Sequence, residues 1–240
     1  MLNWLVGTVT KSITETSDAV SLVLDVPGWT GHRAGQHVDV RLTADDGYSA
    51  ERSYSIASSP GSDGVELSIV RLDDGEVSPY LTGLMAGDQF ELRGPIGGYF
   101  VWERTEMRPV LLLGGGSGVV PLMSMLRYHA ELHPPSPMRL VYSARAEADI
   151  LYRDELATLS GDEGNVIITL SREPSSTWSG RRGRIDRDLL SQLTNPVSDD
   201  LLCFVCGPTP FVEAMADALV ALGLKPDNVK TERFGPTNGG

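Results

Sequence analysis

The fold of this chain is decided by the segment Leu113-Gly114-Gly115-Gly116-Ser117-Gly118-Val119-Val120-Pro121. An apolar run leads into it, small residues turn the chain, and Pro121 suits the first turn of a helix. Small residues let backbone N–H groups approach a pyrophosphate, and a helix N-terminus adds positive potential there. The G-x-G-x-x-G pattern is not met, because Val119 stands where the last glycine is required. We therefore predict a strand–turn–helix unit, in which either a ligand-free tight turn forms or a pyrophosphate is held by Gly115, Gly116, Ser117 and Gly118.

Downstream of this segment, apolar strands alternate with amphipathic helices. The expected strands cover residues 110–113, 140–143, 166–170, 201–206 and 229–234. Helix starts are expected at Thr209-Pro210, as N-cap and first position, and at Asp186, as a cap. This alternation is typical of a parallel sheet with crossover helices. It predicts an α/β domain over residues 105–240.

Upstream of the segment, short alternating or β-branched runs are separated by turn residues. Examples are the runs 20–26, 37–42 and 65–70, with turns such as Asp45-Asp46-Gly47 and Asp73-Asp74-Gly75 between them. Strands at this spacing predict a small antiparallel barrel or sandwich. The expected fold class is therefore two-domain, with an N-terminal antiparallel β-barrel over residues 1–104 before the α/β parallel-sheet domain.

Length and charge limit the function classes. The chain has 240 residues and a formal net charge of −12, which argues against nucleic-acid binding through broad phosphate neutralisation. No apolar window approaches the length of about 20 residues that spans a bilayer, so we expect no membrane span. The start of the chain, Met1 to Val6, carries no basic region before an apolar core. We therefore expect no signal peptide and a cytoplasmic location.

The two cysteines lie three residues apart in one expected strand, at Cys203 and Cys206. In an extended strand such positions point to opposite faces, which argues against a local disulfide or a shared metal. A plant-type iron–sulfur cluster needs four thiolates. We therefore expect no metal in this chain, and any such cluster would belong to a partner.

Four short motifs follow one another along the chain. They are Arg52-Ser53-Tyr54-Ser55, the run from Gly94 to Phe100, the glycine turn, and Cys206-Gly207-Pro208. In this combination the chain resembles the ferredoxin-NADP reductase superfamily, specifically its compact members without an iron–sulfur domain. The resemblance covers essentially the whole chain. It implies a barrel that holds FAD and an α/β domain that holds a nicotinamide dinucleotide.

On the flavin side, the resemblance implies that Arg52 pairs with flavin phosphate, Tyr54 lies against the isoalloxazine and Ser55 hydrogen-bonds near its N5. A guanidinium forks onto phosphate, and a phenol ring supplies a flat apolar wall. The alternative is a surface cation beside ordinary strand packing, and Ser78 could equally be a plain helix cap. The further cofactor-binding residues implied are Ser53, Ile69, Val70, Gly75, Val77 and Ser78.

On the nicotinamide side, the resemblance places Cys206, followed by Gly207 and Pro208, beside the carbon that gives up hydride. The alternative is that Cys206 is a buried structural thiol. Cys203 is interpreted as a thiol of that structural kind. Glu232 would relay a proton or hold Ser55, and Phe234 would stack on the flavin ring. Ser55, Cys206 and Glu232 are thus the candidate catalytic residues. The plant-type enzymes finish at a tyrosine, whereas this chain continues six residues beyond Phe234. A role for Phe234 as a displaceable lid is therefore a hypothesis.

Two expected strands end in a serine and an arginine, Ser143 with Arg145 and Ser171 with Arg172. NAD-specific sites usually carry an acidic residue near the second strand end, to accept from the ribose 2′-hydroxyl. Two arginines there suit a 2′-phosphate, which favours NADPH. Glu147 and Asp149 lie close to the same strand end and could accept from a ribose 2′-hydroxyl. NADH therefore remains an alternative cofactor.

The expected function is hydride transfer from NADPH to FAD, followed by electron release to a separate protein such as an iron–sulfur ferredoxin. One alternative is an NADH-dependent reductase component of an oxygenase or haem-protein system. A flavin-free dehydrogenase would leave the barrel motifs without a role. An alternative of another class is a non-catalytic flavin- and nucleotide-binding module, since fold alone does not imply activity.

Overall fold

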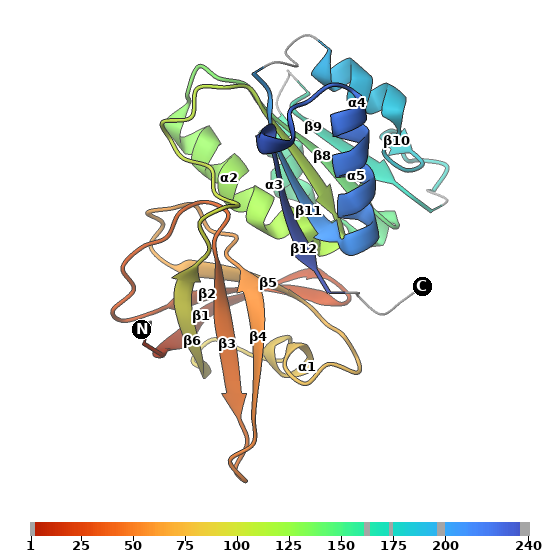
Figure 1. Cartoon of the computed structure of the whole chain (residues 1–240). Helices are drawn as coiled ribbons and strands as arrows, with labels where there is room; N and C mark the ends of the chain where they lie inside the picture. The colour runs from red at the N-terminus through yellow and green to blue at the C-terminus, as the bar shows by residue number, and fades with distance from the viewer. Residues whose placement is uncertain (1–2, 161–163, 173–174, 196–199, 236–240) are drawn as a thin grey trace. The chain divides into compact units, whose positions relative to one another are not determined.

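The computed structural model describes residues 3–160, 164–172, 175–195 and 200–235. The chain forms two compact units (Figure 1). The first consists of Met1–Glu103 together with Met123–Tyr128, and the second of Arg104–Leu122 together with His129–Gly240. The first unit is therefore discontinuous in sequence.

The first unit is an antiparallel sheet whose edges meet. Its strands pair in the order β4-β3-β6-β1-β2-β5. A bridge between Ile56 and Leu67 joins the β4 end of the sheet to β5, which closes the sheet and decides for a barrel over an open sandwich. The elements are β1 (Leu5–Thr16), β2 (Ala19–Asp25), β3 (His37–Thr43), β4 (Ser49–Ser55), β5 (Val65–Val70), the short helix α1 (Ser78–Leu81) and β6 (Gln89–Ile96).

The barrel core follows from the period of two along each strand. Val38 and Val40 on β3 are fully buried, whereas Asp39 between them is only partly buried and faces the other side. On β2, Leu22 and Leu24 are likewise fully buried. Alternation of this kind fills the barrel with branched apolar side chains and leaves polar ones outside.

The second unit is a parallel sheet in the order β10-β9-β8-β7-β11-β12. Its strands are β7 (Val110–Gly115), β8 (Met138–Ala144), β9 (Val166–Leu170), β10 (Arg181–Arg182), β11 (Leu202–Pro208) and β12 (Val229–Phe234). Its helices are η1 (Gly116–Gly118), α2 (Val119–Leu132), η2 (Glu147–Asp149), α3 (Arg153–Ser160), α4 (Arg187–Thr194), α5 (Thr209–Ala221) and η3 (Pro226–Asn228). The strand order reverses between β7 and β11, and ligands of open α/β sheets bind outside the carboxyl ends at such a reversal.

The helix signals in the sequence had different outcomes. Asp186 caps α4 as predicted, since its side chain accepts from the Leu189 N–H, and Pro121 lies in the first turn of α2. The prediction for Thr209 is wrong: α5 begins at Thr209 itself, with Pro208 as the N-cap residue and no side-chain cap. Within the described ranges, no helix has the length and apolar character needed to span a membrane.

Candidate functional site

The glycine turn follows β7 and packs against the end of β11. A Cβ on Gly118 would lie 2.1 Å from the Cys206 carbonyl oxygen, and one on Gly115 would lie 2.8 Å from the Phe211 ring. Gly116 differs, because its φ is +54° and a Cβ there would meet nothing within 4 Å. Two of these glycines are therefore required by packing. Gly116 leaves open space beside the backbone at the strand reversal, which fits a pyrophosphate.

Cys206 lies at that reversal, fully buried on β11. Its strand neighbour in register is Glu232 of β12. Burial raises the pKa of the Cys206 thiol well above its ordinary value, and the Glu232 charge raises it further, so the group stays a neutral thiol. Cys203 lies within the apolar core of this unit, and burial raises its pKa to about 12.

Glu232 is a partly buried carboxyl at the same edge of the sheet. Burial raises the pKa of Glu232 to about 7, so near neutral pH it holds and releases a proton with comparable ease. Phe234 ends β12 opposite Pro208 and is partly exposed. The hypothesis that Phe234 is a displaceable lid stays a prediction, and the residues after Gly235 lie outside the described ranges.

The ends of β8 and β9 bring the two serine–arginine pairs together. The Arg172 N–H donates to the Arg145 carbonyl oxygen at 2.9 Å. Ser171 donates to the Ala144 carbonyl oxygen from its N–H at 3.0 Å and from its hydroxyl at 3.2 Å. Both arginine side chains are exposed, and within the described ranges neither guanidinium has a hydrogen-bonding or ion-pair partner. Ser143 lies on the same strand end as Arg145.

The nearby acidic residues are engaged locally. Glu147 pairs with Arg153 and accepts from the Ser175 hydroxyl. Asp149 accepts from the Ala146 N–H at 3.0 Å. Both carboxylates therefore have partners other than Arg145.

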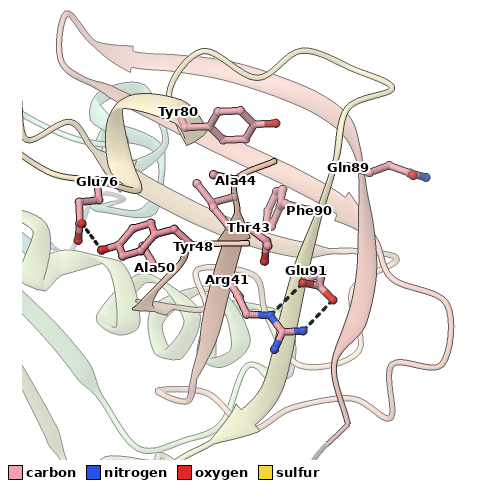
Figure 2. Close-up of a pocket in the computed structure, with 11 residues that line it drawn as sticks. Arg41, Thr43, Ala44, Tyr48, Ala50, Glu76, Tyr80, Gln89, Phe90 and Glu91 are labelled. Atoms are coloured by element: carbon pink, nitrogen blue, oxygen red, sulfur yellow. Dashed lines mark hydrogen bonds and ion pairs between the residues drawn. The ribbon is translucent and has the colours of Figure 1, made fainter. Parts of the chain in front are cut away.

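In the first unit, Arg52 is half exposed on β4 and held by a carboxylate that sequence analysis did not single out. Its Nη2 pairs with Glu76 at 2.7 Å, and its Nη1 donates to the Glu51 carbonyl oxygen at 2.7 Å. Glu76 also accepts from the Tyr48 hydroxyl at 2.5 Å, as Figure 2 shows. The Tyr48 hydrogen bond has the largest effect on the pKa of Glu76 and lowers it. Burial opposes this effect, and the hydrogen bond and charge of Arg52 lower the pKa further, so that it lies below its usual value. The guanidinium keeps further donors, since it carries five N–H groups.

Beyond Arg52, β4 carries three more residues of the motif. The Ser55 hydroxyl oxygen is buried and has no hydrogen-bond partner within the part of the chain that the structure describes. Tyr54 packs against the barrel core, and burial raises its pKa to about 12. Ser53 instead donates to Asp39 at 2.7 Å, on the β3 side. An isolated buried hydroxyl costs about 1–3 kcal/mol, and this orphaned atom beside a neutral phenol fits a flavin.

The loop before α1 is closed by Ser78. Its hydroxyl accepts from the Leu72 N–H at 3.0 Å, and the Gly75 N–H donates to the Leu72 carbonyl oxygen at 2.9 Å. The alternative that Ser78 is a plain helix cap is wrong, because Val77 is the N-cap residue and no side chain caps the helix. Val77 is buried, as is Ile69 on β5, whose last residue, Val70, is partly exposed.

Comparison with known proteins identifies both units. The model of the oxidoreductase FAD-binding domain matches residues 7–101, and that of the oxidoreductase NAD-binding domain matches residues 112–217. Ferredoxin–NADP reductase B of Sorangium cellulosum is 36% identical over 209 residues, covering 84% of each chain. The glycine betaine monooxygenase reductase subunit of Chromohalobacter salexigens is 32% identical over 235 residues, which cover 95% of this chain and only 63% of that protein.

Among solved structures, the FAD/NAD-binding domain of nitric oxide dioxygenase from Vibrio cholerae superposes with a TM-score of 0.84 at 25% identity, covering 97% of this chain and 99% of that one. The two-domain architecture and both cofactor types predicted from the motifs are thereby confirmed. The chain belongs to the ferredoxin-NADP reductase superfamily.

Proposed function

We propose that this protein transfers a hydride from NADPH to FAD and passes the electrons to a separate protein acceptor such as a ferredoxin. The observation that carries this proposal is the buried Ser55 hydroxyl, which has no hydrogen-bond partner among the described residues. FAD, when bound, accepts a hydride at N5 and releases electrons one or two at a time. The protein supplies binding, orientation and exclusion of water.

On the flavin side, Ser55 would hold N5 through a hydrogen bond from its hydroxyl, and Tyr54 would form a wall against the isoalloxazine. Arg52 would contact the flavin phosphate through the N–H donors that Glu76 leaves free. The loop of Gly75, Val77 and Ser78 contributes backbone donors beside it. The set of proposed flavin-binding residues is completed by Ser53, Ile69 and Val70.

On the nicotinamide side, Cys206 lines the contact as a neutral thiol, because burial prevents its ionisation. The glycine turn would hold the pyrophosphate through Gly115, Gly116, Ser117 and Gly118, with Gly207 and Pro208 as further cofactor-binding residues. Glu232 holds a proton that it can release near neutral pH. Phe234 would stack on the flavin ring, as the lid hypothesis requires.

The preference for NADPH is supported by the adjacent ends of β8 and β9, which present Arg145 and Arg172 with Ser143 and Ser171. Two guanidinium groups suit a 2′-phosphate bidentately. NADH is the second candidate, because the NADH oxidoreductase HCR of Escherichia coli is 32% identical over 88% of this chain. That relative is matched over only 62% of its own length.

For the acceptor, we propose an iron–sulfur ferredoxin, an oxygenase or a haem protein. The 2-halobenzoate 1,2-dioxygenase electron transfer component of Burkholderia cepacia, 32% identical over 97% of this chain, supports an oxygenase partner. With two cysteines, both buried and free, this chain lacks the thiolates for a plant-type cluster. We further propose that it works in the cytoplasm.

An anaerobic absorption experiment tests the proposal. Purified protein is expected to show a flavin spectrum that bleaches within seconds after one equivalent of NADPH and more slowly with NADH. Equal rates with both nucleotides would contradict the proposed preference and leave the hydride transfer standing. Colourless protein that binds no added FAD would contradict the function as a whole.

A further inference from the structure

The segment that follows Ser55, the last residue of β4, is held by hydrogen bonds from several directions. The Ile56 N–H donates to the Gln36 carbonyl oxygen at 3.0 Å. The Ala57 N–H donates to the Glu66 carbonyl oxygen at 2.8 Å. These backbone bonds continue the pairing of the barrel beyond β4, so the end of the strand that carries the Ser55 hydroxyl is not free to fray.

Helix α2 adds side-chain hydrogen bonds to the same segment. The fully buried Ser124 hydroxyl donates to the Ser58 carbonyl oxygen at 2.6 Å. Arg127 Nη1 donates to the Ala57 carbonyl oxygen at 2.8 Å and to the Glu66 carboxylate at 2.9 Å. This stretch of α2 belongs to the first unit. Two peptide carbonyls just after β4 are thus fixed by side chains that lie 66 and 70 positions later in the chain.

Ser58 is the residue at which these bonds converge. Its carbonyl oxygen also accepts from His32 Nε2 at 3.0 Å, and its hydroxyl accepts from the Glu66 N–H at 3.0 Å. A carbonyl oxygen has two lone pairs, so Ser124 and His32 satisfy it together. Loss of the Ser124 hydroxyl would leave this buried carbonyl with one donor and loosen the bend that it anchors.

The state of the Ser55 hydroxyl shows what this anchoring does. The hydroxyl is buried without a hydrogen-bond partner among the described residues, which is unfavourable because it has given up its bonds to water. A group in such a position persists only where the surrounding structure over-determines it. The bonds from α2 to Ala57 and Ser58 supply that constraint, because they oppose a shift of the strand end that would bring the hydroxyl to water.

We propose that Ser124 and Arg127 are positioning residues for hydride transfer, which hold the Ser55 hydroxyl in place through the carbonyls of Ala57 and Ser58. The inference rests on the proposed function, since it assumes that Ser55 contacts the flavin. A displacement of about 1 Å at a reacting centre lowers a rate about a hundredfold. A small shift of this strand end is therefore enough to slow the reaction, although neither side chain bonds to the hydroxyl itself.

The first test uses apoprotein and a double-mutant cycle. Ser55→Ala alone is expected to raise Tm, because it removes an unsatisfied hydroxyl. In the Ser124→Ala background the strand end relaxes and the hydroxyl reaches water, so Ser55→Ala is expected to raise Tm by about half as much or less. Differential scanning calorimetry of the four proteins measures the difference. An equal gain in both backgrounds would overturn the proposal.

The second test applies the same cycle to the FAD-loaded protein, with reduction by NADPH followed by stopped-flow absorbance. Ser124→Ala is expected to slow reduction about fivefold to tenfold and to leave the Kd of FAD within about twofold of wild type. In the Ser55→Ala background, Ser124→Ala is expected to change the rate by less than about twofold, because the group that it positions is absent. Equal slowing in both backgrounds would show that Ser124 acts independently of Ser55 and would overturn the proposal.

A second variant addresses a folding defect in Ser124→Ala. Arg127→Lys keeps a cation beside the Glu66 carboxylate but loses the planar fork that reaches the Ala57 carbonyl as well. It is expected to show the same non-additivity with Ser55→Ala in both measurements. Additive effects of Arg127→Lys and Ser55→Ala would remove Arg127 from the proposed pair.

A matched control removes a hydroxyl-to-carbonyl bond elsewhere in the barrel. Thr10 on β1 donates to the Val23 carbonyl oxygen at 3.0 Å, and Thr10→Val keeps the branched shape of the side chain. Its effect on Tm is expected to add independently to that of Ser55→Ala, and the rate of reduction is expected to stay unchanged. Failure of wild-type protein to bind flavin would overturn the proposed function and the positioning role with it, whereas additivity in flavin-binding protein would overturn the positioning role alone.

Discussion

At the scale of single residues, the hydroxyl of Ser55 is the feature whose chemistry points most directly to a ligand. A buried hydroxyl without a partner opposes folding, because it has given up its hydrogen bonds to water. The sequence placed Ser55 in the site through the motif that begins at Arg52. It could not reveal that Glu76 holds Arg52, or that Tyr48 in turn donates to Glu76, because these two pairs meet through tertiary contacts across 24 and 28 positions of sequence. No local pattern encodes such contacts.

Ser55→Ala is expected to raise the stability of the flavin-free protein and to slow the reduction of the flavin-bound protein. Without flavin, the variant should be more stable by about 1 kcal/mol, because an unsatisfied hydroxyl is removed. With flavin, reduction by NADPH should be about tenfold to hundredfold slower, because a preorganised donor is lost. Thermal unfolding of apoprotein and stopped-flow absorbance measure the two effects. Ser17→Ala, at an exposed position of the same unit, is the control and should change neither.

Glu232 makes stability depend on pH in a defined direction. Its pKa is raised from 4.5 to about 7 by burial in the folded protein, so its contribution to stability is complete below pH 4.5 and is lost as the pH rises through about 7. Glu232→Gln should therefore unfold at a higher temperature than wild type at pH 8, and this advantage should shrink toward pH 4.5. Arg233→Gln on the same strand should show no such trend. An advantage of equal size at both pH values would contradict the assignment.

At the scale of elements, the main strands were predictable and the short polar elements were not. The expected strand 166–170 coincides with β9, because its β-branched run is typical of strands. The expected strand 229–234 coincides with β12 although only Val229 on it is buried, because it continues the alternation of strands and helices. Helix α3 was missed, since only Leu156 on it is buried and eight residues give little periodicity. Strand β10 is two residues long and forms by pairing with β9. The sequence Arg181-Arg182 does not predict this tertiary contact.

Gly118 shows what the glycine turn requires of its sequence. Gly118→Ala places a methyl group 2.1 Å from the Cys206 carbonyl oxygen, so β11 or the turn must move. Overpacking of this kind costs about 1–3 kcal/mol, or roughly 2–10 °C in Tm for a chain of this size. Differential scanning calorimetry measures the change. Gly83→Ala, where the nearest atom would lie 3.5 Å away, is the matched control, and an equal effect of both would show that the close approach is not what matters.

At the scale of the whole molecule, the first unit is completed by a stretch that comes later in the chain. Within this unit the Ser124 hydroxyl donates to the Ser58 carbonyl oxygen at 2.6 Å, and Arg127 pairs with Glu66 at 2.9 Å with both side chains largely buried. Tyr128 meets Trp102 edge to face at 5.7 Å between ring centroids. Sequence analysis divided the chain at a single boundary, because hydrophobic periodicity assigned the whole of α2 to the parallel sheet.

Arg127→Met is expected to destabilise the first unit, because it leaves the buried Glu66 carboxylate without its ion-pair partner. Breaking a buried pair costs about 3–5 kcal/mol. The double variant Glu66→Gln with Arg127→Met should recover part of this loss, since the excess charge is gone. Urea unfolding followed by tryptophan fluorescence measures both. A double variant less stable than Arg127→Met would contradict the role given to the ion pair.

The interleaving of Met123–Tyr128 with the barrel residues bears on how such reductases can be recombined. A hybrid joined at the linker near Arg104 inherits a barrel from one parent and the six residues that complete it from another. Recombination of two reductases at that junction therefore favours parents that carry compatible residues at these six positions. A crossover placed after Leu132, where α2 ends, transfers the barrel together with the six residues that complete it.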